Sequence, residues 1–172
     1  GTILIGGKGL AAPYKFLEGA TVLLLAVCHH QPSIFGVVLN HMMNESMDGA
    51  FCPSSRAKYP NFVNSTVRYG GPNAPHWTVL ARASSPGAHA VVPGLFAGGS
   101  LLDLNRQVAR GQTVRDSVAF YSGYVAWQLA DLKKQIENGD WLVAQAPASL
   151  LLKTPSASNG TQFTAALTAA LK

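Results

Sequence analysis

The sequence predicts a single α+β domain over residues 1–172, built from a mostly antiparallel or mixed sheet with a few flanking helices. Short apolar runs come in pairs that turn residues separate, and helical patterns occur between the later runs. Hydrophobic residues make up 48% of the chain and charged residues 12%, a composition that favours a folded core over disorder. No internal repeat or boundary indicates a second domain.

Three strands are predicted near the start of the chain. Residues 2–5 (TILI) form a short apolar strand. Residues 20–28 (ATVLLLAVC) are the longest apolar run, far shorter than the roughly 20 residues that a membrane-spanning helix needs. Residues 35–40 (FGVVLN) follow after a polar turn, so these last two runs predict a hairpin.

The glycine-rich segment at residues 6–9 (GGKG) does not predict a phosphate-binding loop. Residues 7–12 (GKGLAA) formally match the dinucleotide pattern G-x-G-x-x-[GA], but that motif must open a helix and Pro13 follows at once. The P-loop pattern fails as well, because no Ser or Thr follows Lys8. We expect a mobile loop here.

The middle of the chain combines a polar segment with further strands. Residues 44–66 are rich in Pro, Ser and Asn and predict a long loop or insertion. Strands are expected at residues 67–69 and 77–80. Residues 91–96 (VVPGLF) are also strand-like, but Pro93 cannot donate to a ladder, so this strand should lie at an edge or contain a bulge.

Two helices are predicted from capping signals and periodicity. Ser100 can cap a helix over residues 101–110, which Gly111 would end. A linker at residues 153–161 leads to a C-terminal helix over residues 162–171, whose apolar side chains share one face.

A further helix and a strand carry two of the three tryptophans. The helix is expected over residues 125–138 and should end at Gly139. Residues 140–144 (DWLVA) then form a short strand. We expect Trp127 and Trp141 to fix this helix to the sheet rather than to line a ligand pocket. The apolar positions that define the helical period are Val125, Leu129, Leu132 and Ile136.

Charge and cysteine content exclude some classes of function and weaken others. The net charge is +5, but basic residues are scattered singly, with residues 133–134 the one adjacent pair, so a concentrated nucleic-acid footprint is only weakly supported. Cys28 and Cys52 are too few for a disulfide framework.

A metal site was considered at the end of the longest apolar run. In a strand, Cys28 could share a face with His30 but not with the residue between them. Neither C-x-x-C nor H-x-x-x-H occurs, although a structural zinc site needs four ligands. We therefore expect structural histidines, no metal and no other cofactor. The residues considered were Cys28, His29, His30 and His41.

No catalytic residues are predicted. A nucleophile needs an adjacent base and a group that orients this base, and no G-x-S-x-G pattern is present. The sparse acidic residues fit surface or capping positions. They include Asp103, Asp116, Asp131, Glu137 and Asp140.

Four segments match the motifs of one known family. Residues 35–40 are similar to its G-[LV]-[VI]-[LI]-N strand, and residues 69–72 (YGGP) to its G-G-P turn. Residues 91–98 look like the strand before its second helix. Residues 123–129 (GYVAWQL), followed by Trp141, are similar to its G-Y-[AC]-G-W-Q-L segment and later tryptophan. Together they resemble the AlgH-like family of largely uncharacterised proteins, which occurs in bacteria, plants and algae.

The resemblance carries expectations about fold and location. It implies an α+β fold whose sheet is curled into a pseudo-barrel, and it implies no established enzyme activity. The forms VVPGL and GYVAWQL look most like the plant and algal branch, which implies a nuclear-encoded protein with a transit peptide for the plastid. We expect the chloroplast stroma or a membrane-associated complex there, with the cytoplasm as the alternative.

Some positions depart from the family pattern. Ala126 replaces a usual glycine, Asp131 a usual glutamine and Gln135 a usual glutamate, and residues 41–42 (HM) replace Arg-Pro. Polar helix positions would be the first candidates for a shared site, so these departures count against conserved chemistry.

A shared cleft is expected around the residues that match the motifs. Glycines permit close backbone approach, and an asparagine at a strand end can cap a turn. Both roles are structural, and residues in these roles would also shape a cleft. They are His30, Asn40, Gly70, Gly71, Pro72, Tyr124 and Trp127.

The sequence favours a non-catalytic domain that binds other proteins as a regulator or assembly subunit, within a larger plastid complex. A transcriptional regulator associated with nucleic acid is the alternative, since the bacterial namesake is linked to transcriptional regulation. A small enzyme or metal-binding protein is the second alternative. No transmembrane segment is predicted.

Overall fold

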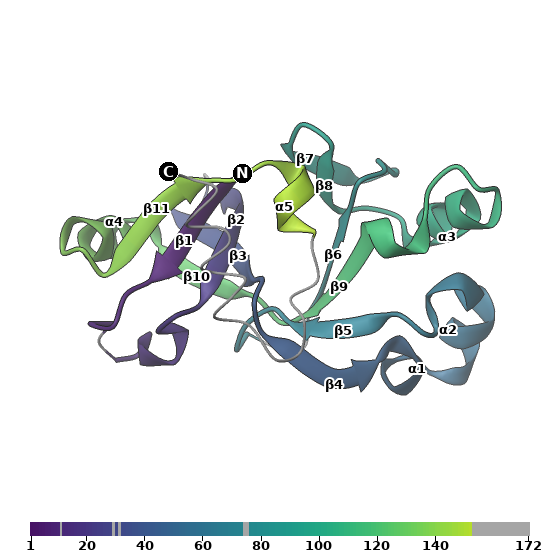
Figure 1. The fold of residues 1–172 in the computed structure, drawn as a ribbon, viewed down its shortest axis with the longest axis horizontal. Coiled ribbons are helices and arrows are strands. Elements are labelled where there is room, and N and C mark those ends of the chain that lie inside the picture. Colours follow the sequence, from purple (N-terminus) through teal and green to yellow (C-terminus); the bar gives the residue numbers. More distant parts are fainter. Residues whose placement is uncertain (11, 29, 31, 74–75, 153–172) are drawn as a thin grey trace.

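The computed structural model describes residues 1–10, 12–28, 30, 32–73 and 76–152. Within these residues the strands form two sheets, which lie side by side in Figure 1. The strand order of the first sheet is β10-β3-β2-β1-β11, and all of its neighbouring strands are antiparallel. Its strands are β1 (Thr2–Gly6), β2 (Thr21–Cys28), β3 (Ser33–Val38), β10 (Val125–Gln128) and β11 (Trp141–Gln145).

The second sheet is mixed, with the strand order β4-β5-β9-β6-β8-β7. Strands β5 and β9 are parallel, whereas the other pairs are antiparallel. The α+β class with a mixed sheet is therefore confirmed. The strands divide between two sheets, however, and they do not close into a barrel. The strands of the second sheet are β4 (Met42–Ser46), β5 (Thr66–Tyr69), β6 (Trp77–Ala81), β7 (Ala88–Val92), β8 (Leu95–Gly98) and β9 (Val118–Ser122).

Short helices flank the sheets at both ends of the molecule. In Figure 1, α1, α2 and α3 lie at the far end of the second sheet, α4 lies beside the first sheet, and α5 lies between the two sheets. None of the described helices is long and apolar enough to cross a membrane. The α-helices are α1 (Met47–Ala50), α2 (Pro53–Lys58), α3 (Leu101–Ala109), α4 (Leu129–Glu137) and α5 (Ala148–Leu151); the 3₁₀ helices are η1 (Lys15–Leu17), η2 (Pro60–Phe62) and η3 (Arg115–Ser117).

Several local predictions are confirmed. Strands β2 and β3 form the expected hairpin. The Ser100 side chain caps α3 by accepting a hydrogen bond from the Asp103 backbone N–H at 3.2 Å. Pro93 lies in the turn between β7 and β8, and β7 is an edge strand. Residues 44–66, where a long loop or insertion was expected, contain the end of β4 and the short helices α1, α2 and η2. The predicted linker and C-terminal helix lie outside the described residues.

The first sheet is covered on both faces. In successive residues of β2, Val22 packs into the core beneath α4, and Leu23 packs into the core between the two sheets. A strand that is buried on both faces needs apolar residues at consecutive positions rather than at alternate ones. This arrangement explains the first part of the apolar run, since residues 21–23 are buried, whereas Ala26 and Val27 near the end of β2 are exposed. A third core, which includes Phe62 and Phe120, lies between the second sheet and the helices α1, η2 and α3.

The predicted helix over residues 125–138 is wrong in its first turn. Residues 125–128 form β10, and only Leu129 onward is helical. Trp127 pairs with Ile34 of β3, and it is 2% exposed. Val125 lies four positions before Leu129, a spacing that fits the helical period as well as the period of two residues of a strand. The periodicity therefore did not distinguish a strand from a helix. Pairing with β3 decided the outcome, because it places Val125 and Trp127 on one buried face.

Candidate functional site

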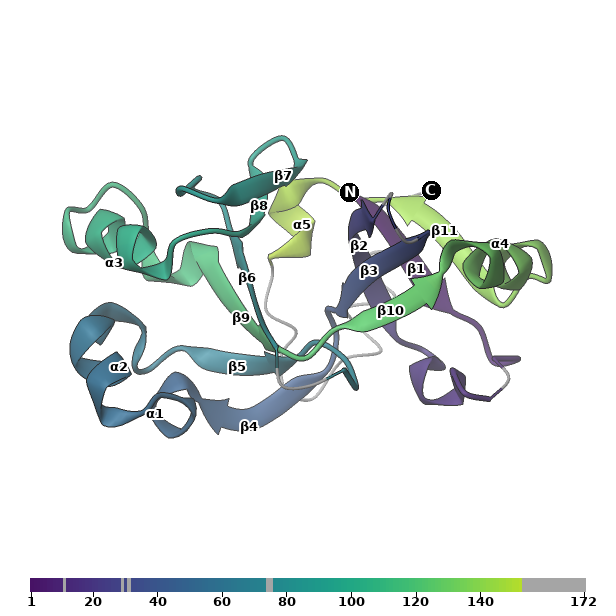
Figure 2. The same cartoon turned by 180° about the vertical axis from the view of Figure 1, so that it is seen from behind.

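The two sheets are joined where the segment after β5 contacts the segment after β9. Three glycines lie at this crossing, namely Gly70, Gly71 and Gly123. From behind, Figure 2 shows the connection from β9 to β10 passing from one sheet to the other. Gly70 N–H donates to the Ser122 carbonyl at 2.7 Å, and Val38 N–H donates to the Gly70 carbonyl at 2.9 Å. A Cβ atom on Gly70 would lie 2.3 Å from the Gly123 carbonyl oxygen. Backbone contacts this close leave room for glycine alone, so the predicted G-G-P turn serves to join the sheets.

Asn40 ties the two strands of the first hairpin together. Its Oδ1 accepts a hydrogen bond from Thr21 N–H at 2.8 Å, and its Nδ2 donates to the Gly19 carbonyl at 2.9 Å. The residue is 7% exposed. The side chain thus satisfies backbone groups that the start of β2 would otherwise leave buried without partners.

His41 and Tyr69 stack beside this crossing. Their ring centroids are 6.0 Å apart, and Tyr69 N–H donates to the His41 carbonyl at 3.2 Å. Burial lowers the pKa of His41 and raises the pKa of Tyr69, because each shift favours the uncharged form. The surroundings of His41 therefore favour its neutral form.

The two tryptophans lie beneath α4, as the sequence predicted. Their rings meet edge to face at a centroid distance of 5.7 Å, and the ring of Tyr14 stacks on Trp127 at 6.0 Å. The Trp141 indole N–H donates to Gln135 Oε1 at 2.9 Å. Both indoles are almost fully buried, and they share a core with Leu132 of α4.

The residues expected to form a shared cleft occupy different parts of the fold. Gly70 and Gly71 meet the backbone before β10 at the crossing. Tyr124 packs partly against the core between the sheets, whereas Trp127 belongs to the core beneath α4. Pro72 and His30 are exposed. The shared cleft stays a prediction.

A cavity of about 390 Å³ lies between the segment before η1 and α4. Tyr14 lines it together with Asp131 and Gln135, the two helix positions that depart from the family pattern. Burial raises the pKa of Tyr14, and the Asp131 carboxylate raises it further. Gln135 already accepts the Trp141 indole hydrogen, so its side chain serves the core as well as the cavity. Within the described residues, no group of three or more His, Cys, Asp or Glu side chains could hold a metal ion.

Strand β11 presents a row of backbone groups at the open edge of the first sheet. It pairs with β1 on one side, and no described strand lies on its other side. Ala146 N–H donates to the Gly1 carbonyl, and Gly7 N–H donates to the Asp140 carbonyl. Antiparallel pairs alternate between bonded and non-bonded positions. The N–H and C=O groups of Trp141, Val143 and Gln145 therefore point away from β1, toward the open edge.

The side chains of β11 add an apolar surface to this edge. Leu142 is 54% exposed and Val143 is 44% exposed. The strand sequence WLVAQ contains no charged residue and no proline, although natural edge strands commonly use both to prevent pairing with another chain. No local signal in the sequence indicates this surface, since the position of a strand at an edge depends on the strand order of the sheet.

Comparisons with known proteins agree with one another. A family model described as AlgH-like matches residues 11–170. A UPF0301 protein of Chlorobium luteolum is 27% identical over 155 residues, which cover 86% of this chain and 78% of that protein. A UPF0301 protein of Cereibacter sphaeroides is 29% identical over 156 residues, which cover 88% and 82%.

Solved structures of low sequence identity share the fold. The solution structure of the AlgH protein from Pseudomonas aeruginosa aligns with a TM-score of 0.70 at 18% identity, covering 99% of this chain and 86% of that one. A crystal structure of a protein from Corynebacterium diphtheriae aligns with a TM-score of 0.71 at 16% identity, covering 97% and 84%.

Proposed function

This chain belongs to the AlgH-like family, and we propose that it acts as a non-catalytic, protein-binding domain, a regulator or assembly subunit that works in the plastid. The proposal places the partner at the open edge of β11. An extended segment of the partner would add a strand to the first sheet there, in the mode of β-strand addition.

The observation that supports this proposal most is the combination of outward backbone groups and exposed apolar side chains on one strand. Backbone hydrogen bonds to the N–H and C=O groups of Val143 would supply affinity, and contacts with Leu142 would supply specificity. Strand β11 contains no charged residue and no proline that would prevent such pairing.

The partner strand should be apolar at consecutive positions, because both of its faces would be buried. Leu142 and Val143 are consecutive, so their side chains leave the sheet on opposite faces. A partner strand would therefore extend both cores of the first sheet, because Ala144 packs against the core between the sheets and Trp141 belongs to the core beneath α4.

The test replaces a single outward N–H group. Val143→Pro removes the N–H that faces the open edge without removing a hydrogen bond to β1, and proline is tolerated on edge strands at such positions. Val143→Thr is the matched control, since it keeps the N–H and the β-branched shape. Both variants are tagged and incubated with chloroplast stroma and solubilised chloroplast membranes, and bound proteins are identified by mass spectrometry.

We expect Val143→Thr to retain the partner of the wild-type chain and Val143→Pro to lose it, with affinity reduced about tenfold or more for the lost hydrogen bond and the distorted edge. Retention of the same partner by a folded Val143→Pro variant would exclude β11 as the binding edge. Sedimentation equilibrium of the purified chain reveals whether the added strand comes from a second copy.

A further inference from the structure

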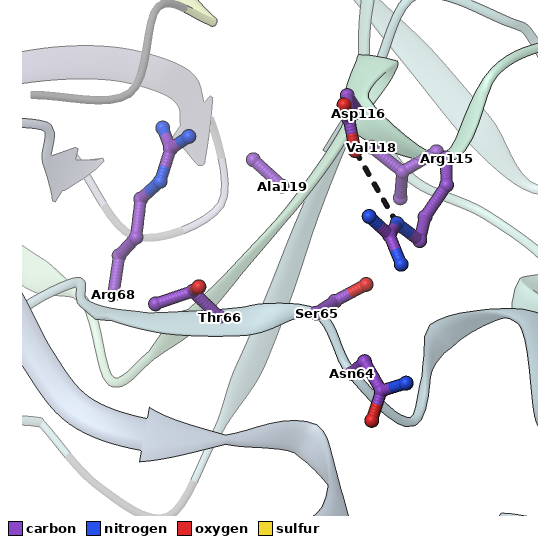
Figure 3. A pocket seen from close by; sticks show the side chains of 8 residues that line it. All are labelled: Asn64, Ser65, Thr66, Arg68, Arg115, Asp116, Val118 and Ala119. Carbon is purple, nitrogen blue, oxygen red and sulfur yellow. Dashed lines mark hydrogen bonds and ion pairs between the residues drawn. The ribbon is translucent and has the colours of Figure 1, made fainter.

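A polar cavity of about 190 Å³ lies where β5 and β9 run parallel, at the end of the molecule opposite to β11. A water molecule takes about 30 Å³ of liquid, so this space can hold a group of several heavy atoms. Figure 3 shows side chains from both strands and from η3 around the cavity. The lining residues that matter here are Ser65, Thr66, Arg68, Arg115 and Asp116.

Arg115 directs part of its guanidinium group into the cavity. Its Nε lies 3.3 Å from Asp116 Oδ1, and one of its two terminal nitrogens points toward Ser65 (Figure 3). The Asp116 side chain is 85% exposed, so solvent screens its charge. The ion pair uses Nε alone, so the two terminal nitrogens of Arg115 form a fork that can donate to an acceptor in the cavity.

Ser65 provides a second polar group at the cavity. Its hydroxyl oxygen is buried, and it has no hydrogen-bond partner among the described residues. The backbone around it is fixed, because Ser65 N–H donates to the Phe62 carbonyl and the Ser65 carbonyl accepts from Met47 N–H. Buried polar groups are normally hydrogen-bonded, so this hydroxyl indicates an acceptor or donor that the described residues do not supply.

Arg68 places a fixed positive charge in the opposite wall. It is 5% exposed, and its Nη1 donates to the Tyr121 hydroxyl at 2.9 Å. A second nitrogen lies 3.5 Å from the Leu152 carbonyl. These contacts hold the guanidinium in position, and its charge adds to that of Arg115. Two guanidinium groups and one exposed carboxylate line this partly enclosed space, so its net charge favours an anion.

We propose that this cavity binds the phosphate group of a small phosphate monoester. The two terminal nitrogens of Arg115 match two oxygens of a phosphate. The Ser65 hydroxyl could donate to a third phosphate oxygen, which points in another direction. A tetrahedral oxyanion offers acceptors in three directions, whereas a carboxylate offers them in one plane. The fit therefore favours phosphate over a carboxylate ligand.

The rest of the ligand has a place next to the phosphate. A second cavity, of about 460 Å³, shares Asn64, Arg115 and Asp116 with the first. Its other walls include Pro60, Val108 and Val114, which give it an apolar side. An ester group attached to the bound phosphate would lie against these residues. The two cavities together thus distinguish a monoester from free phosphate.

Titration of the purified chain with two probes tests the proposal. Inorganic phosphate and glycerol 3-phosphate are each added at low chloride concentration, and binding is followed by calorimetry and by the ligand-dependent shift of the melting temperature. Tighter binding of glycerol 3-phosphate assigns the second cavity to the ester group. Equal binding of both probes identifies free phosphate as the source of the bound group.

Matched variants locate the site. Arg115→Gln should weaken binding about tenfold or more, because it removes the charged fork, and Ser65→Ala should weaken it by a smaller factor. Arg106→Gln is the control, since Arg106 is also an exposed arginine in an ion pair with a nearby aspartate. Failure of both probes to bind the wild-type chain, or equal losses in Arg115→Gln and Arg106→Gln, would overturn the proposal.

Discussion

The carbonyl oxygen of Gly71 lies so close to Gly123 that a Cβ atom on Gly123 would come within 2.1 Å of it. The two residues belong to the segments that leave the second sheet after β5 and after β9. Their contact holds the two sheets in their relative positions, and both partners of the clash are backbone atoms. Neither atom can move away as a flexible side chain could.

Gly123→Ala should destabilise the protein strongly. Gly123 has a φ of +76°, which costs about 1–2 kcal/mol for a residue with a Cβ atom, and overpacking adds about 1–3 kcal/mol. Gly139→Ala is the control, since Gly139 has a φ of +80° and no atom within 4 Å of the added Cβ. Urea unfolding of both variants should show the larger loss for Gly123→Ala. Equal losses would mean that the close contact carries no energy of its own.

Trp127→Ala should cost about 3–5 kcal/mol of unfolding free energy, because it removes a large aromatic side chain from the core beneath α4. Trp77 is the matched control within the same chain, since its side chain is 48% exposed. Trp77→Ala should change stability by much less. The melting temperatures of the two variants measure the difference, and similar shifts would contradict the role of Trp127 as a core residue.

Cys52 should react with alkylating reagents near neutral pH. The hydroxyl groups of Ser54 and Ser55, at 3.1 and 3.2 Å from its Sγ, lower the pKa of this exposed thiol to about 7. In a Cys28→Ser background, the rate of reaction with iodoacetamide should therefore be half-maximal near that pH. Replacing both serines with alanine should move the midpoint upward, since the thiolate loses two donors. An unchanged midpoint would remove the assigned cause.

Stability should fall as the pH decreases past the ordinary pKa of histidine, in part because of His41. Burial lowers the pKa of His41 in the folded state below 6.5. The unfolded chain therefore binds a proton first, and stability is lost between pH 6.5 and the lower folded pKa. His41→Gln should flatten the pH dependence of the unfolding free energy as the pH falls below 6.5. An unaltered slope in this variant would assign the dependence to other groups.

The fold class and several elements could be predicted from local patterns. The apolar run at residues 20–28 indicates a buried strand, and β2 is fully buried over residues 21–23. Ser100 indicates the start of α3 through a capping signal. The strand at residues 125–128 could not be distinguished from a helix, because its pairing with β3 depends on residues about ninety positions earlier in the chain.

The candidate sites were less predictable than the fold. The cavity with Ser65 and Arg115 exists because β5 and β9 pair in parallel, and no local motif records contact between segments so far apart. Asn40 was recognisable as a strand-end residue, and the structure gives it the role of joining β2 and β3. The open edge of β11 follows from the strand order alone.

Amide hydrogen exchange in β11 tests the central claim most directly. In the free chain, the outward amides of Val143 and Gln145 should exchange much faster than the inward amides of Leu142 and Ala144, which β1 protects. Addition of the partner retained by the wild-type chain should slow exchange at Val143 and Gln145. Unchanged exchange at both outward amides in the complex would show that the partner binds elsewhere.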